Sequence, residues 1–244
     1  MSVKSASTGP FDNLAAIRDL VARMGGLTER QLNGAADALG RRDSKMAEQI
    51  ILADDAIDEM ERQIEQQMVN IAADAGAGQD DWVGGLALIR IASDLERVGD
   101  LAKNLAKRTL VLNQSPQQRS TQGLIRMIHA VQTQLGDVLD AFSALDADKA
   151  RSVWQADGTI DELNNGLFQE ITSMMMDQPH MIAVGTHLLF MAKNVERIGD
   201  HCTNIAEIIV AIVEGAPLDD DRPKADRTSL TMVQPTDGAQ PKVG

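Results

Sequence analysis

Apolar residues recur every three or four positions along most of this chain, which is the spacing of a helix with one buried face. Ile57, Met60, Ile64, Met68 and Ile71 form one such series. No stretch shows a convincing alternation of apolar and polar residues, which would be typical of a half-buried strand. The pattern therefore predicts an all-α protein.

Six long helices are predicted, separated by short segments that contain capping residues, glycine or proline. Asp43 and Asp146 stand where an N-cap is expected, Ser115-Pro116 suits a helix start, and Gly78 and Pro179 mark breaks. Helices of about 30 residues are about 45 Å long, and short connections make them antiparallel neighbours. The predicted helices cover residues 11–40, 44–74, 80–112, 117–144, 147–176 and 179–214.

The first three helices and the last three carry the same residues at matching places. The phrase ERVGDLAKN at 96–104 recurs as ERIGDHCTN at 196–204, which is 100 positions later. Upstream, ADDAIDEMERQI at 53–64 matches ADGTIDELNNGL at 156–167, which is 103 positions later. Such self-similarity indicates a duplicated structural unit. We therefore predict two tandem antiparallel three-helix bundles, six helices in all, related by an internal pseudo-twofold axis.

The duplication divides the chain into three parts. Residues 11–114 are predicted to form the first bundle and residues 115–216 the second. The fall in offset from 103 to 100 places three additional residues of the first half in the polar stretch 73–81. Residues 217–244 are rich in Pro, Asp, Gly and Thr and lack periodicity, so a disordered tail is predicted there.

The composition favours helices and argues against nucleic acid as a partner. Aromatic residues make up 2% of the chain, so the core must consist of aliphatic residues, alanine and methionine, which favours helices. A net charge of −13 without a basic stripe argues against nucleic-acid binding. The single Cys202 fits a reducing compartment. Without a signal peptide or a membrane-spanning run, a cytosolic protein with no direct membrane insertion is expected.

The repeated phrase places two carboxylates four residues apart on one helix face in each half. Glu96 and Asp100 form this pair in the first half, and Glu196 and Asp200 form it in the second. Like charges at this spacing repel and weaken a helix, which favours a bound cation or partner. The alternative is an ordinary solvated face, neutralised by the arginine that follows each glutamate.

A second acidic pair lies on the preceding helix of each half. These pairs are Asp54 with Asp58, and Asp157 with Asp161. If the second and third helices of a half are antiparallel neighbours, four carboxylates can face each other and share cations. Such an all-oxygen ligand set suits hard ions such as Mg²⁺, Ca²⁺, Mn²⁺ or oxygen-ligated iron.

Two further features of the repeat have more than one explanation. Gly99 and Gly199 lie within helices, where glycine costs roughly 1 kcal/mol relative to alanine. Close helix packing and the approach of a cation or another helix explain them about equally well. Asp94 is a further ligand candidate, but its counterpart is Asn194, so the two sites are expected to differ.

The chain carries no recognisable catalytic motif. It has no P-loop, no dinucleotide fingerprint and no nucleophile elbow. None of the four histidines lies three residues after a glutamate, so the Glu-x-x-His unit of di-iron bundle proteins is absent. We expect a protein that is not an enzyme. A metal-storing or metal-dependent helical bundle of ferritin-like type is the alternative.

The doubled ER[VI]GD…N phrase, the upstream ID-E blocks and MGG at 24–26 resemble the PhoU family of bacterial phosphate-transport regulatory proteins. The resemblance covers roughly residues 11–215. It implies tandem three-helix bundles, often dimeric, whose acidic motifs hold metal ions (Mg, Mn, Fe or Zn). By motif match, the metal positions are Glu96, Asp100, Glu196 and Asp200, followed by Asp54, Asp58, Asp157 and Asp161.

The same resemblance implies a function. PhoU-like proteins are non-enzymatic negative regulators in the cytosol. They couple the ATPase subunit of a high-affinity phosphate transporter to a sensor histidine kinase, and they repress the phosphate-starvation response when phosphate is plentiful. We expect this chain to do the same, as a homodimer.

Overall fold

The computed structural model describes residues 14–73, 78–116, 119–218 and 225–231. Every regular element within these residues is a helix, which confirms the all-α prediction. The described elements, in chain order, are α1 (Ala15–Arg41), α2 (Ser44–Ala53), α3 (Asp55–Ala73), α4 (Gln79–Leu112), α5 (Ser120–Ala144), α6 (Ala147–Gln155), α7 (Asp157–Asp177), η2 (Pro179–Met181), α8 (Ile182–Glu214) and η3 (Thr228–Leu230), where η marks a 3₁₀ helix.

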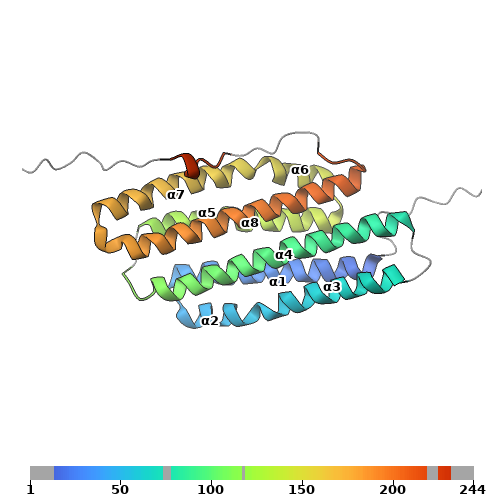
Figure 1. The fold of residues 1–244 in the computed structure, drawn as a ribbon, viewed down its shortest axis with the longest axis horizontal. Coiled ribbons are helices and arrows are strands. Elements are labelled where there is room, and N and C mark those ends of the chain that lie inside the picture. Colours follow the sequence, from blue (N-terminus) through green and yellow to red (C-terminus); the bar gives the residue numbers. More distant parts are fainter. Residues whose placement is uncertain (1–13, 74–77, 117–118, 219–224, 232–244) are drawn as a thin grey trace, which may run out of the picture.

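The helices form two bundles that lie side by side and correspond to the two halves of the chain (Figure 1). The first bundle consists of α1 to α4 and the second of α5 to α8. At the junction α4 packs against α8, which runs in the opposite direction, and α1 packs against α5 (Figure 1). One continuous apolar core extends through both bundles. The predicted architecture is therefore confirmed, with the two bundles packed on each other.

The capping predictions for the second helix of each half are confirmed. The backbone N–H of Met46 donates to Oδ1 of Asp43 at 3.0 Å, and that of Lys149 donates to Oδ1 of Asp146 at 2.9 Å. The residue before each cap, Arg42 or Leu145, has the left-handed backbone conformation that ends the preceding helix. Equivalent residues of the repeat therefore end one helix and cap the next in the same way.

The link between the two bundles differs in detail from the prediction. α5 begins at Ser120, whereas Ser115 and Pro116 lie in the link after α4, so the prediction that they open a helix is wrong. Gly78 precedes α4 and Pro179 opens η2, as the punctuation predicts. Residues 11–13 of the first predicted helix lie outside the described residues.

The second predicted helix of each half is broken into two. Asp54 separates α2 from α3, and Ala156 separates α6 from α7, next to Asp157. Asp54 is 1% exposed and Asp157 is 4% exposed, so both breaks lie at a buried aspartate. Both aspartate side chains accept hydrogen bonds from neighbouring helices, so each break lies beside a buried polar contact. The apolar spacing continues across the break, so periodicity alone does not reveal it.

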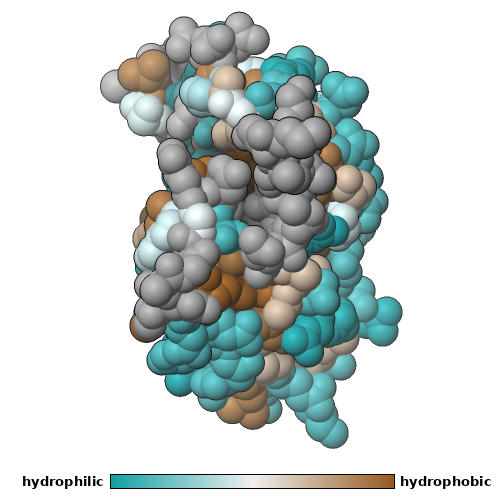
Figure 2. Space-filling model, turned by 90° about the vertical axis from the view of Figure 1, so that its right-hand side faces the viewer, coloured by the Kyte–Doolittle hydropathy of each residue, from teal (hydrophilic) through white to brown (hydrophobic). Residues whose placement is uncertain are grey.

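At one end of the molecule, polar residues surround an apolar area (Figure 2). Figure 2 looks along the bundle from one end and shows hydrophilic residues over most of the area that grey atoms do not cover, with an apolar area in the middle. Among the described helices, none combines the length and the apolarity needed to cross a membrane.

The C-terminal segment is partly described. Residues 225–231, for which we predict disorder, contain η3 and lie beside α7 (Figure 1). They are held by polar side chains of α7, a kind of contact that apolar periodicity cannot predict. Residues 219–224 and 232–244 lie outside the described residues.

Candidate carboxylate sites

Two glycines bring the second and third helices of each half close together. A Cβ atom at Gly99 would lie 3.0 Å from Cδ1 of Ile57, and a Cβ atom at Gly199 would lie 3.2 Å from Oε1 of Gln134 and 3.5 Å from Cγ2 of Ile160. Ile57 and Ile160 are equivalent positions of the repeat. Close packing therefore explains both glycines, and it sets the acidic pairs of neighbouring helices near each other.

In the first half, Asp54 is the centre of a buried polar network. Nε2 of Gln31 donates to Oδ1 of Asp54 at 2.7 Å and to the carbonyl oxygen of Gly99 at 3.2 Å. The ammonium group of Lys103 donates to Oδ2 of Asp54 and lies 3.6 Å from Oδ1 of Asp100. Both oxygens of Asp54 are therefore bonded. A positive charge that belongs to the chain itself stands between two predicted metal ligands.

The other two predicted ligands of the first half are less acidic than in water. Burial raises the pKa of Glu96 to about 7, and Arg97 offsets this effect in part. Burial, followed by the charge of Asp54, raises the pKa of Asp58. Nε of Arg97 lies 3.4 Å from Oε2 of Glu96, but the arginine side chain is 58% exposed. Arg97 is thus a solvent-screened partner that offsets the burial of Glu96 only in part.

In the second half, Asp157 has an uncharged partner. The hydroxyl of Thr203 donates to Oδ1 of Asp157 at 2.9 Å and accepts from Nε2 of Gln134 at 3.4 Å. Gln134 and Thr203 stand at the positions that Gln31 and Lys103 occupy in the first half. The polar network is therefore repeated, but its positive charge is not.

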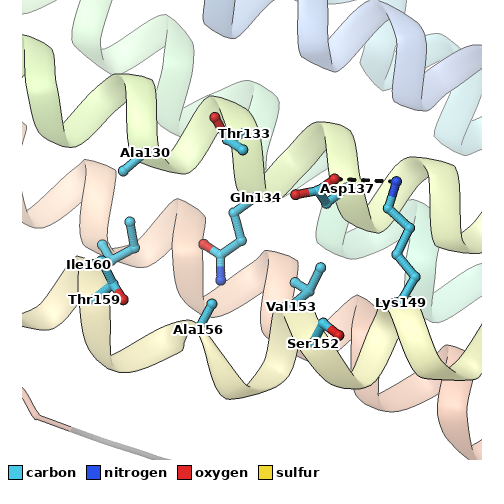
Figure 3. Close-up of a pocket in the computed structure, with 10 residues that line it drawn as sticks. All are labelled: Ala130, Thr133, Gln134, Asp137, Lys149, Ser152, Val153, Ala156, Thr159 and Ile160. Atoms are coloured by element: carbon cyan, nitrogen blue, oxygen red, sulfur yellow. Dashed lines mark ion pairs between the residues drawn. The ribbon is translucent and has the colours of Figure 1, made fainter.

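A pocket of about 300 Å³ opens beside this network, between α5 and the break that separates α6 from α7 (Figure 3). The amide of Gln134 points toward its middle, and Ala156 and Ile160 contribute to its wall (Figure 3). An ion pair of 3.3 Å between Lys149 and Asp137 borders the pocket. The lining includes none of the predicted metal ligands, so this pocket is separate from the carboxylate site.

Asp161 and Glu196 are engaged by the chain itself. Oδ2 of Asp161 accepts from the backbone N–H groups of Ala225 at 2.7 Å and Asp226 at 2.9 Å. Nζ of Lys193 lies 2.8 Å from Oε2 of Glu196 and 3.2 Å from Oδ2 of Asp226. The contact with Glu196 is an ion pair without hydrogen-bond alignment. Burial raises the pKa of both Asp161 and Glu196.

Asp94 joins the two halves instead of entering the first site. Its Oδ1 lies 2.7 Å from Nδ1 of His201 and accepts from Nδ2 of Asn204 at 3.3 Å, and both of these residues lie on α8. Farther along the same junction, Nη1 of Arg108 lies 3.2 Å from Nδ1 of His187. The carboxylate of Asp94 therefore serves the α4–α8 contact.

The predicted carboxylates thus gather in each half, but they do not form a ready-made metal centre. Within the described residues, no group of three or more His, Cys, Asp or Glu side chains is arranged to hold a metal ion. In the first half, the ammonium of Lys103 lies where a cation would meet Asp54 and Asp100, so this set as arranged does not fit a metal ion. In the second half, Thr203 brings no charge to Asp157, but the ammonium of Lys193 lies 2.8 Å from Oε2 of Glu196, so a cation there would compete with Lys193 for Glu196. The metal positions stay a prediction.

Some important residues carry no obvious motif. Gln31 and Gln134 recur with the same offset of 103 as the acidic blocks, which is the signal that could have identified them. Lys103 lies inside the repeated phrase, where its replacement by Thr203 marks the difference between the halves. Asp226 lies in a segment without periodicity, and no sequence signal connects it to the site.

Comparison with known proteins identifies relatives of this architecture. The family model described as PhoU domain matches residues 21–109 and 124–209. A protein of Caulobacter vibrioides, named phosphate-specific transport system accessory protein PhoU homolog, is 40% identical over 216 residues, which are 88% of this chain and 94% of that protein. A protein of the same name from Rhizobium meliloti is 40% identical over 210 residues, 86% of this chain and 89% of the relative.

Solved structures show the same fold. The crystal structure of PhoU from Pseudomonas aeruginosa aligns with a TM-score of 0.81 at 35% identity and covers 84% of this chain and all of that one. The phosphate transport system regulatory protein PhoU from Streptococcus pneumoniae aligns with a TM-score of 0.77 at 31% identity, over 85% of this chain and 98% of that one.

Proposed function

This chain belongs to the PhoU domain family, and on that basis we propose that it is an accessory protein of a phosphate-specific transport system. The observation that carries the proposal is the similarity to relatives of that name over 88% of this chain and 94% of the relative. The doubled acidic phrase and the two packed bundles lie within the matched residues.

In its finer form, the proposal is that the protein regulates phosphate uptake without catalysing a reaction. It couples the transporter's ATPase subunit to a sensor histidine kinase from the cytosolic side, as a homodimer, and represses the starvation response when phosphate is plentiful. Support comes from family membership. The ferritin-like alternative is not favoured, because the named relatives are transport accessory proteins.

The metal proposal is confined to the second half. Asp200 on α8 and Asp157 on α7 would hold the ion through carboxylate oxygens, together with Glu196, which would exchange its ion pair with Lys193 for the ion; Mg, Mn, Fe and Zn are the candidates. The ion would supply the positive charge that Lys103 supplies in the first half. What supports this assignment is the absence of a counterpart to Lys103 at Thr203.

Deletion of the gene in its host tests the regulatory role. A phosphate-starvation reporter is followed in medium with plentiful phosphate, in the deletion strain and in the same strain complemented with the full chain. The proposal predicts that the reporter is on after deletion and off again after complementation. A reporter that stays off in the deletion strain contradicts the regulatory role.

A further inference from the structure

Residues 225–231, named here the C-terminal strap, are bound to α7 through their main chain. Oδ2 of Asp161 accepts two backbone N–H groups of the strap, at 2.7 and 2.9 Å. Nδ2 of Asn165 donates to the carbonyl oxygen of Ala225 at 2.8 Å, and Oδ1 of Asn165 accepts from the backbone N–H of Arg227 at 2.9 Å. These contacts are made to the main chain of the strap and place no demand on its side chains.

The strap passes over one face of α7 at an ordinary van der Waals distance. Gly158, Asp161 and Asn165 are spaced by three and four residues, so they share one face of α7. A Cβ atom at Gly158 would lie 4.0 Å from Cβ of Ala225, which shows how near the strap passes.

One side chain of the strap is recognised by charge. Oδ2 of Asp226 lies 3.2 Å from Nζ of Lys193 on α8, and Oδ1 of Asp226 accepts from the backbone N–H and the hydroxyl of Thr228. The face therefore selects a segment with a carboxylate at this position, in the turn that leads into η3.

The strap leaves the apolar part of the same surface open. A pocket of about 340 Å³ lies beside Thr228, with Phe168, Leu189 and Phe190 in its lining. The strap places no buried side chain there, and its Leu230 is 86% exposed. The strap is therefore held by polar contacts without an apolar anchor, and a segment that makes the same contacts and also fills the pocket would displace it.

The surface has no counterpart in the first half. Arg62 stands at the position equivalent to Asn165, and Ser93 stands at the position equivalent to Lys193. The repeated carboxylate motif therefore does not explain these contacts, and the equivalent residues of the first half provide matched controls.

We propose that Asp161, Asn165, Lys193 and the adjoining apolar pocket form a docking groove for a short segment of a partner protein. The segment carries a carboxylate that meets Lys193 and, two residues later, an apolar side chain that fills the pocket. The strap occupies this groove as an internal competitor that lacks the apolar side chain. The groove is a property of the surface, whether or not the protein regulates phosphate uptake.

The test uses the full chain and a fluorescent peptide with the sequence of residues 225–231, in which leucine replaces Thr228 so that it can fill the pocket. Asp226→Lys in the protein introduces an ammonium group next to that of Lys193, and the repulsion between the two releases the strap. Fluorescence anisotropy is expected to show the peptide binding to Asp226→Lys at least about tenfold more tightly than to the wild type. Asn165→Ala added to that variant abolishes binding, whereas Arg62→Ala leaves it unchanged.

Absence of binding, equal binding to the wild type and Asp226→Lys, or binding that survives Asn165→Ala would overturn the proposal. A second measurement needs no substitution in the protein. In the wild-type chain, excess unlabelled peptide is expected to speed hydrogen exchange at the amides of residues 225–227, because the peptide displaces the strap. Unchanged exchange at saturating peptide would show a permanent strap and would also overturn the proposal.

Discussion

Lys103 and Thr203 stand at equivalent positions of the repeat, yet they complete the polar networks of their halves differently. Lys103 brings a charge to Asp54, and this hydrogen bond is the main cause that raises the pKa of the lysine, so the ammonium form is favoured. Thr203 brings a hydroxyl to Asp157. A buried carboxylate is costly unless it is hydrogen-bonded or paired. The first half therefore contains its own counter-ion, and the second half lacks one at this position.

Removal of the Asp54 carboxylate is expected to destabilise the protein strongly. Asp54→Ala leaves Lys103 and Gln31 without their buried partner, which costs about 3 kcal/mol in the free energy of unfolding. Urea unfolding at pH 7 measures this loss. Asp55→Ala, at the exposed neighbouring residue, is the control and changes stability by less than about 0.5 kcal/mol. Equal losses in the two variants would contradict the network.

The carboxyl group of Glu96 is expected to make stability depend on pH when metal is removed by a chelator. Its pKa is about 7 in the native state against 4.5 as the ordinary value, so between these values the native state binds more protons than the unfolded state. Stability therefore falls as pH rises through this window. Glu96→Gln removes this contribution, so the variant gains roughly 2 kcal/mol relative to the wild type between pH 4 and pH 8.

Urea unfolding at several pH values measures the effect of Glu96→Gln. The matched control is Glu59→Gln, at an exposed residue of α3. If both variants keep the pH dependence of the wild type, burial of Glu96 is not its source.

At the scale of elements, equivalent residues begin and interrupt the second predicted helix of each half. Asp43 caps α2 and Asp146 caps α6, whereas Asp54 and Asp157 lie at the breaks that follow. The caps lie on the surface and act locally. The breaks are tied to buried networks with neighbouring helices.

Loss of either cap is expected to have the same effect. Asp43→Ala and Asp146→Ala should each lower the free energy of unfolding by about 1 kcal/mol, because a backbone N–H of the first turn loses its acceptor. Glu48→Ala, at an exposed residue inside α2, is the control and should change little. Chemical denaturation measures all three, and a clear difference between the two caps would mean that the halves start these helices differently.

Local patterns predict the helices and their caps because these features depend on neighbouring residues in the chain. The acidic pairs are also visible, since each lies at helical spacing in a duplicated phrase. The breaks at Asp54 and Ala156 are not visible, because they depend on partners such as Gln31 that are distant in sequence. The strap is hidden for the same reason, since its binding depends on Asn165 of α7.

At the scale of the whole molecule, the two bundles share one apolar core and a polar junction. Asp94 with His201, and Arg108 with His187, connect α4 to α8 at two places along their length. A continuous core makes the two halves unfold together.

Each half contains one tryptophan, so this cooperativity can be measured. Trp82 lies in α4 and Trp154 in α6. Trp82→Phe leaves a reporter in the second half, and Trp154→Phe leaves one in the first. For each variant, tryptophan fluorescence and helical circular dichroism are expected to give the same urea midpoint. Midpoints that separate within one variant would show that the halves unfold independently.

Our main proposal is that the doubled acidic motif forms two different sites, of which only the second binds a metal ion. Its most direct test is the exchange of Lys103 and Thr203. Manganese is titrated into the metal-free full chain, and binding is followed by calorimetry with the melting temperature as a second readout. The wild type is predicted to bind manganese in the second half alone, Lys103→Thr to gain an additional site, and Thr203→Lys to lose the existing one. A wild type that binds no manganese, or binding that neither substitution changes, would contradict the proposal that the doubled motif forms two different sites.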